Sequence, residues 1–357
     1  MTTITDVARA AGVSPATVSR VFNGGRVTPE RAARVRRAAA ELGFEPNRVA
    51  QSLRKQRGSV IGLLIPDIEN PFFTSLARGV EDAAQQTGLS VVLCNTDEDI
   101  DKERRYLGIA LAEQMAGVIV AAASRTQTDL SPLAARGMPA VAVDRRPRGA
   151  LVDAVLVDNQ YGGEAATEHL LRARYRRIAC VTGPEGASTS EERLAGYRSA
   201  LRDALADGTL TPEDGDDPLT AYVRYADFKV GGGRAAMADL LAMERPPDAV
   251  FVANNLMAVG ALEVLREAGV TPPEFGVLSF GGVPWAGLVR PSLTTVELPS
   301  YELGFTAAKL LQERIAGSEK ALQTVVLRTG LSVRDSTGGP HDDAEGQGRL
   351  RAPSPLG

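Results

Sequence analysis

The chain has 357 residues, 44% of them hydrophobic, which is enough to build a small domain together with a larger core of one or two lobes. No apolar run is long enough to span a membrane, and the amino terminus lacks the charged-then-apolar pattern of a secretion signal, so we expect a cytoplasmic protein with no membrane partner. The net charge of −4 conceals a polarity, because residues 1–57 carry 11 Lys and Arg against four Asp and Glu. A basic end attracts a polyanion such as DNA, and the alternative is a solvated charged face with no partner.

Residues 5–26, TDVARAAGVSPATVSRVFNGGR, predict two short helices joined by a tight turn. The first begins with Thr5 as the N-cap and stops at Gly12. The second begins with Ser14 as the N-cap and Pro15 at the first helical position, where a missing N–H costs nothing. This pattern is typical of a helix-turn-helix, whose second helix lies in the major groove of DNA with its early residues at base edges.

The apolar residues of the second helix, Val18, Val21 and Phe22, are predicted to face inward. Its outward residues, which would meet DNA, are Pro15, Ala16, Ser19 and Arg20. The alternative is a solvated helical hairpin whose apolar residues merely pack together.

A third helix is predicted over residues 28–43, opened by Thr28-Pro29 and ended by Gly43, with Ala33, Val35 and Leu42 completing a small core. The sequence EPNRVAQSLRKQRG follows. From Ile4 to Arg54 the chain resembles the DNA-binding head and hinge of the lactose-repressor (LacI/GalR) family of bacterial transcription regulators. The resemblance continues through IGLLIPDIENPFF, LCNTDED, ERLAGY and FVANNLMAVGAL.

The resemblance implies a homodimeric repressor that binds a double-stranded operator containing an inverted repeat. It implies DNA contact by Thr5, Ser14, Pro15, Ala16, Thr17, Ser19, Arg20, Asn23 and Arg26 in the head and by Asn47, Arg48, Ala50, Leu53 and Arg54 in the hinge. The hinge, residues 47–55, is too short to be a stable helix alone, so its order must come from a partner, which in the family is the hinge of a second subunit. Leu53 matches the family's leucine wedge in the minor groove, and the alternative is an ordinary apolar contact on a linker.

Apolar strand runs alternate with amphipathic helical stretches between Ser59 and Arg334, which predicts an α/β fold with mostly parallel sheets. The predicted strands are VIGLLIP, LSVVLCN, AGVIVAA, PAVAVD, AVLVD, RIACVTG, DAVFVAN and FGVLSF, and the predicted helices cover 71–87, 102–113, 160–172, 192–206, 231–243 and 256–268. No GxGxxG follows the first strand and no GxxxxGK[ST] occurs, so a dinucleotide-dependent dehydrogenase is disfavoured.

The family's core has two lobes with a ligand cleft between them, the fold of periplasmic binding proteins. The resemblance therefore predicts a helix-turn-helix head (1–46), a hinge helix and linker (47–57), and a core (58–335). Lobe 1 of the core would cover about 58–158 and 291–318, and lobe 2 about 159–290 and 319–335. The chain would cross between the lobes near Asp158, Arg290 and Ser318. Residues 207–227 are predicted to form a surface loop with a short strand, TAYVRY. The tail, 336–357, is rich in Gly, Pro and charge and is expected to be disordered; it has no leucine heptad, which favours a dimer over a tetramer.

Cofactor and metal chemistry find no support in the sequence. Cys94 and Cys180 lie in apolar runs and predict neither a disulfide nor a reactive thiol. His169 and His341 are far apart, and no metal-ligand spacing is present. We therefore expect no cofactor, no metal and no enzymatic activity.

An effector site is implied by the resemblance, position by position. The matching residues are Asn70 and Phe72 in ENPFF, Asp144 after PAVAV, Arg193 in ERLAGY, Phe228 in ADFKV, Asn254 and Asn255 in VANNL, and Gly281 in SFGG. In family members that bind sugars, an aromatic ring covers the apolar face of the sugar while arginine, carboxylates and amides bond its hydroxyls. The alternative is that the phenylalanines belong to the core and that Asp144 serves a turn or a helix cap.

Two departures from the family pattern concern one wall of this cleft. The family's GFDD is SFGG here, with Gly281 and Gly282 in place of two acids, and its Asn-Asp pair is Asn254-Asn255. Carboxylates are strong acceptors for hydroxyls, so their loss weakens the hypothesis of a simple sugar and favours a sugar acid or sugar phosphate, held by Arg193 and Lys229. The remaining alternatives are a regulator without an effector and, from other classes, a ligand-binding protein or an enzyme on the same fold.

Overall fold

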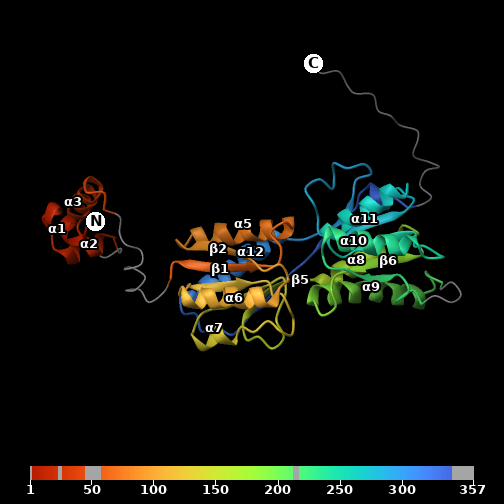
Figure 1. Ribbon diagram of the computed structural model, residues 1–357, viewed down its shortest axis with the longest axis horizontal. Helices are drawn as coiled ribbons and strands as arrows, with labels where there is room; N and C mark the ends of the chain where they lie inside the picture. Colours follow the sequence, from red (N-terminus) through yellow and green to blue (C-terminus); the bar gives the residue numbers. More distant parts are fainter. Residues whose placement is uncertain (1, 23–25, 45–57, 212–216, 340–357) are drawn as a thin grey trace, which may run out of the picture. The chain divides into compact units, whose positions relative to one another are not determined.

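The computed structural model describes residues 2–22, 26–44, 58–211 and 217–339, drawn in colour in Figure 1. The chain divides between Ser59 and Val60 into a small helical head and a larger α/β core. Among these residues, no helix combines the length and the apolarity needed to cross a lipid bilayer.

The head contains α1 (Ile4–Ala11), α2 (Pro15–Phe22) and α3 (Pro29–Glu41). The predicted N-cap of α1 was wrong by two residues: Thr3, not Thr5, accepts the N–H of Asp6, and Asp6 in turn accepts the N–H of Thr3. This reciprocal capping box requires an acid three residues after the cap, which Thr3 has and Thr5 lacks. Gly12 ends α1 in the left-handed conformation (φ 63°), as predicted.

The three helices of the head share one apolar core, formed by Val7, Ala8, Ala11, Val18, Val35, Ala38 and Ala39. The prediction of Val35 was confirmed, whereas Ala33 and Leu42 are exposed. Ala33 lies two residues from Val35 and therefore on the opposite face of α3, and Leu42 follows the last turn of the helix. Ala38 and Ala39, at helical spacing from Val35, take their places.

The described residues of the core form two lobes, each with a six-stranded sheet. The strands are β1 (Val60–Ile65), β2 (Ser90–Asn95), β3 (Gly117–Val120), β4 (Ala140–Val143), β5 (Asp153–Val157), β6 (Ile178–Thr182), β7 (Val223–Tyr225), β8 (Ala249–Val252), β9 (Gly276–Phe280), β10 (Thr294–Glu297), β11 (Thr324–Leu327) and β12 (Gly330–Ser332). The sheet of lobe 1 has the order β11-β5-β4-β3-β1-β2 and that of lobe 2 the order β12-β10-β9-β8-β6-β7. All neighbours are parallel except β10 and β12. The predicted α/β class with mostly parallel sheets is confirmed.

Helices cover both faces of each sheet. They are α5 (Pro71–Gln85), α6 (Ile100–Ala112), α7 (Ser131–Ala135), α8 (Asn159–Arg172), α9 (Ser188–Ala206), α10 (Val230–Leu241), α11 (Asn255–Glu267), α12 (Ser300–Ile315) and a 3-10 turn, η1 (Asp335–Thr337). In lobe 1, α5 and α12 lie side by side on one face and α6 and α7 on the other (Figure 1). In lobe 2, α8 and α9 cover one face and α10 and α11 the other. Because both faces are covered, most of the central strands are largely apolar, whereas β10 (TTVE) is not.

The chain passes between the lobes after β5, after β10 and after β11. The predicted crossings near Arg290 and Ser318 were therefore wrong: residues 294–297 pair with β9 in lobe 2, and residues 324–327 pair with β5 in lobe 1. The tail also begins later than predicted. Ser336 is buried, accepts the N–H of Thr294 (2.8 Å) and donates to the carbonyl of Val277 (2.6 Å), so residues 335–337 belong to lobe 2.

Candidate functional site

A cleft between the two lobes is lined by all eight residues for which the resemblance predicted an effector role. These are Asn70, Phe72, Asp144, Arg193, Phe228, Asn254, Asn255 and Gly281. Lys229, predicted only as a contact of an anion, also lines the cleft. Seven further lining residues were not predicted: Asp67, Phe73, Glu98, Arg145, Thr189, Phe280 and Leu298. Most lining residues follow the carboxyl ends of parallel strands, which is where ligands bind in such sheets.

Two asparagines are held at the cleft because each caps a helix. The side chain of Asn70 accepts the N–H of Phe72 (3.0 Å) at the start of α5, and that of Asn254 accepts the N–H of Met257 (2.9 Å) at the start of α11. The amide nitrogen of Asn70 makes no hydrogen bond to the described residues. Capping therefore fixes the orientation of both amides while it leaves NH₂ donors available.

Arg193 is buried and held by three contacts within lobe 2. Its Nε donates to Asn159 (2.9 Å), its Nη1 donates to the carbonyl of Ala253 (2.7 Å), and its guanidinium lies 4.0 Å from the centre of the Phe280 ring. Burial lowers the pKa of Arg193 to about 10, so it remains a cation at neutral pH. The third nitrogen, Nη2, has no hydrogen bond to the described residues, and Arg193 lines the cleft.

Asp144 and Arg145 form a buried charged pair at the end of β4. Arg145 binds both carboxylate oxygens of Glu98 (2.5 and 2.9 Å), and its Nε lies 3.6 Å from Oδ2 of Asp144. Burial raises the pKa of Asp144, and the nearby arginines oppose this shift without cancelling it. Its other oxygen, Oδ1, is buried with no hydrogen-bond partner among the described residues, as is Oγ1 of Thr189. Both atoms lie in residues that line the cleft, so they are candidates for bonds to ligand hydroxyls.

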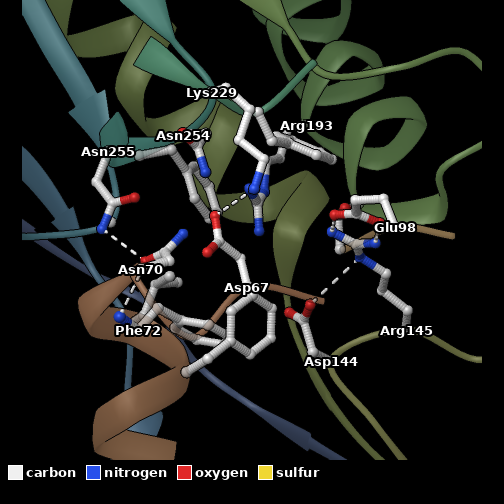
Figure 2. A pocket seen from close by; sticks show the side chains of 16 residues that line it. Asp67, Asn70, Phe72, Glu98, Asp144, Arg145, Arg193, Lys229, Asn254 and Asn255 are labelled. Carbon is white, nitrogen blue, oxygen red and sulfur yellow. Dashed lines mark hydrogen bonds and ion pairs between the residues drawn. The ribbon is translucent and has the colours of Figure 1, made fainter. Parts of the chain in front are cut away.

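Polar contacts join the two lobes across the cleft. Lys229 Nζ lies 2.6 Å from Oδ2 of Asp67, and the amide of Asn255 donates to Oδ1 of Asn70 (3.1 Å), as Figure 2 shows. The guanidinium of Arg145 lies 5.2 Å from the centre of the Phe228 ring. Each contact pairs a residue of lobe 1 with one of lobe 2, so the structure is a closed arrangement of the lobes.

The charges in the cleft balance. Three lining carboxylates, Asp67, Glu98 and Asp144, face three lining cations, Arg145, Arg193 and Lys229. Arg145 and Lys229 each have a carboxylate partner, whereas Arg193 is hydrogen-bonded to an amide and a backbone carbonyl. Within residues 2–22, 26–44, 58–211 and 217–339, no group of three His, Cys, Asp or Glu side chains is placed to hold a metal ion.

In the head, most of the described residues with a predicted DNA contact lie on the surface. Thr5, Ser14, Pro15, Ala16, Arg20 and Arg26 are exposed, and Thr17 and Ser19 are half-buried. Ser14 caps α2 as predicted, since its hydroxyl accepts the N–H of Thr17 (3.2 Å). The remaining predicted contacts, Asn23, Asn47, Arg48, Ala50, Leu53 and Arg54, lie outside the described residues.

Comparison with known proteins agrees with both parts of the chain. Residues 3–47 match the model of bacterial regulatory proteins of the lacI family, and residues 167–337 match that of the periplasmic binding protein-like domain. The ribose operon repressor of Halalkalibacterium halodurans is 37% identical over 95% of this chain and 98% of its own length. The chain belongs to the lacI family.

Two solved structures of this family are similar to the chain. A LacI family regulator from Enterococcus faecium with bound ribose is 31% identical, with a TM-score of 0.68, and the match covers 79% of this chain and 99% of that one. The lac repressor dimer bound to operator and the anti-inducer ONPF is 25% identical, with a TM-score of 0.79, over 94% of this chain and 99% of that one. As a lacI family member with an intact helix-turn-helix head, the chain is a DNA-binding transcription regulator and not an enzyme.

Proposed function

We propose that this lacI family regulator is a cytoplasmic, homodimeric repressor of an operator with an inverted repeat, and that a neutral monosaccharide of the ribose type in the interlobe cleft sets its operator affinity. The observation that carries this proposal is the unmet hydrogen-bonding capacity of the cleft. Asp144 Oδ1 and Thr189 Oγ1 are buried, and neither has a hydrogen-bond partner among the residues that the structure describes. A polyhydroxylated ligand would satisfy both, and the rings of Phe72 and Phe228 offer apolar surface beside them.

A neutral sugar fits the charges of the cleft better than the anion favoured by the sequence. Acids are lost at Asn255, Gly281 and Gly282, but Asp67, Glu98 and Asp144 give the lining as many carboxylates as cations. An anion would have to separate Lys229 from Asp67, or bind beside a buried carboxylate, and either event costs free energy. The named relatives, a ribose operon repressor and a regulator with bound ribose, support the same class of ligand.

The proposed switch works by changing the relative stability of two lobe arrangements. A ligand affects DNA binding only if it binds one arrangement more tightly than the other, and the coupling is reciprocal. A sugar bonded to Asn70 and Asp144 in lobe 1 and to Arg193 in lobe 2 would favour the closed arrangement. Closure would then shift the first lobes of the dimer and change the order of the paired hinges.

The effector assignment is tested by measuring ribose, ribose 5-phosphate and gluconate against the purified dimer. We expect ribose to raise the unfolding midpoint saturably and to change operator affinity in an anisotropy assay. At 100 times its Kd, a ligand specific for the native state adds about 2.7 kcal/mol to the free energy of unfolding. Asp144→Asn should weaken ribose binding, whereas Asp129→Asn, an exposed residue of lobe 1 outside the cleft, should not. Binding of the anions alone would refute the neutral-sugar proposal, and no binding by any of the three would favour a regulator without an effector.

The hinge proposal has a separate test. If Leu53 is a wedge in the minor groove, Leu53→Ala should leave the heads folded and phosphate contacts intact while it reduces the bend in the operator and the preference for its central step. A circular-permutation bending assay measures both proteins on one operator. An unchanged bend would make Leu53 an ordinary linker residue.

A further inference from the structure

A second cavity lies at the boundary of the two lobes, beside the effector cleft. Lobe 1 contributes Arg125, which follows β3, and the segment 146–151 between β4 and β5. Lobe 2 contributes Ser188 and Glu192 at the start of α9. The N–H of Arg148 donates to the carbonyl of Arg125 (2.7 Å), so the two loops of lobe 1 are joined at this wall.

This cavity contains more arginines than carboxylates that are free to pair with them. Arg146 donates to the hydroxyl of Thr324 (3.2 Å), and neither Arg146 nor Arg148 has an ion pair within the described part of the chain. Of the two acids in the lining, Asp144 is already beside Arg145. The other, Glu192, accepts the amide of Asn159 (2.9 Å) and has its pKa raised by burial. The cavity thus presents two exposed guanidinium groups that have no carboxylate partner in the described part of the chain.

The same wall of the cavity also carries exposed apolar side chains, whose contact with water is unfavourable. Leu151 is 84% exposed and is the most exposed of the large hydrophobic side chains in the described residues, and Leu156 of β5 lies in the same lining. Pro147, between the two arginines, is buried. Arginine next to aliphatic surface suits a ligand that has an anionic group on an apolar body.

We propose that this cavity binds a small organic anion, a phosphorylated or carboxylated metabolite with an apolar ring or chain, through Arg146, Arg148 and Leu151. The site is separate from the cleft in which the sugar is proposed to bind, although Asp144 lines both. The ion pair between Arg125 and Glu191 joins the lobes next to it. A ligand held between these elements favours the same lobe arrangement as a ligand in the cleft, so the two sites are coupled. Only this coupling rests on the proposed function; binding of the anion does not.

The probe for the test is phenyl phosphate, which joins a doubly charged group to an apolar ring, and inorganic phosphate is the comparison without the ring. Binding to the full chain is measured by titration calorimetry at fixed ionic strength. The test variant is Arg146→Gln with Arg148→Gln. The matched control is Arg136→Gln with Arg266→Gln, two exposed arginines outside both cavities, which changes the net charge by the same amount.

We expect saturable binding of phenyl phosphate that is tighter than that of inorganic phosphate, is retained in the control, and is weakened about tenfold or more in the test variant, since each lost charge-assisted hydrogen bond is worth about that factor. Ribose binding should be unchanged in the test variant, which separates this site from the cleft. Equal affinity in the two variants, no saturable binding, or complete competition by ribose for one site would overturn the proposal. A Leu151→Ser variant checks the apolar contact and should bring phenyl phosphate down to the affinity of inorganic phosphate.

Discussion

Replacement of Arg193 by lysine separates the geometry of this side chain from its charge. In the wild type, Nε and Nη1 bond Asn159 and the carbonyl of Ala253 at 2.9 and 2.7 Å, and the guanidinium stacks on Phe280. A lysine ammonium keeps the positive charge but cannot reach both acceptors in one fork or lie flat on the ring. It also removes Nη2, the donor proposed to bind the sugar.

The magnitudes follow from these contacts. A buried acceptor left without its donor costs about 1–3 kcal/mol, and a desolvated cation–π contact contributes about 2 kcal/mol. Because such terms do not add fully, we expect Arg193→Lys to lower the free energy of unfolding by about 3 kcal/mol. A lost charge-assisted bond to the ligand, worth about 1.5–3 kcal/mol, should raise the Kd for ribose by about 10- to 100-fold.

Urea unfolding and calorimetry with ribose measure the two effects on the same preparation. The control is Arg198→Lys on the same helix, whose Nε donates to the carbonyl of Leu219 (3.2 Å) away from the cleft. We expect Arg198→Lys to lower the free energy of unfolding by less than Arg193→Lys does and to leave the Kd for ribose unchanged. If Arg193→Lys bound ribose as tightly as the wild type, Arg193 would be a structural residue of lobe 2, and the proposed ligand contact would be wrong.

Three further outcomes are expected. Arg20→Ala should relax the base preference at one position of each half-site, at a cost of about 1–3 kcal/mol, and a binding-site selection would reveal this; an unchanged motif would exclude base contact by Arg20. Asp153→Asn should lower stability by about 3 kcal/mol at pH 7, because Asp153 is buried and holds Arg314 at 2.7 and 2.9 Å. Burial raises the pKa of Asp153, but its contacts with Arg314 and the N–H of Gln323 lower this pKa by more, so the net pKa lies below 3.8. The extra stability of the wild type over Asp153→Asn should therefore be present above pH 3.8 and be lost as the pH falls through the lowered pKa. Urea midpoints of both proteins, measured from pH 7 downward, test this. Gly163→Ala should destabilise by about 1–3 kcal/mol and weaken ribose binding, because its Cβ would overlap the carbonyl of Arg193, whereas Gly231→Ala, on an open helix surface, should do neither.

Most of the strands were predictable because their residues are largely apolar, as expected where helices cover both faces of a sheet. The eight apolar runs predicted as strands all form strands, and TAYVRY contains β7. Three strands were not predicted: β10 (TTVE) and β12 (GLS), which are short and largely polar, and β11 (TVVL), which is apolar but has only four residues. Without them, the second and third crossings between the lobes were misplaced. Helix α12 was not predicted either, although Leu303, Ala307 and Leu311 recur every four residues and are buried. Because this helical spacing is visible in the sequence, α12 could have been predicted.

The cleft was predictable only in part, for a physical reason. The eight positions taken from the resemblance converge there, and Arg145 lies next to one of them, Asp144. The pairing of Lys229 with Asp67 joins residues 162 positions apart, and no local pattern specifies which acid a distant lysine will meet. The net charge of the cleft therefore could not be predicted from the sequence, because the carboxylates that compensate for the lost acids of lobe 2 belong to lobe 1.

Close packing of helices connects the fold to the position of Arg193. Gly163 of α8 lies against the backbone carbonyl of Arg193 on α9, and Gly196 of α9 lies against that of Gln160 on α8, where any Cβ would overlap an oxygen atom. Two reciprocal glycines thus fix the separation of the helices one turn from the cleft, and the same arrangement recurs where α5 meets α12 and where α10 meets α11. A side chain that must bond Asn159 and Ala253 at once tolerates little movement of its backbone. The glycines, which touch no ligand, are therefore part of what holds the arginine in its place.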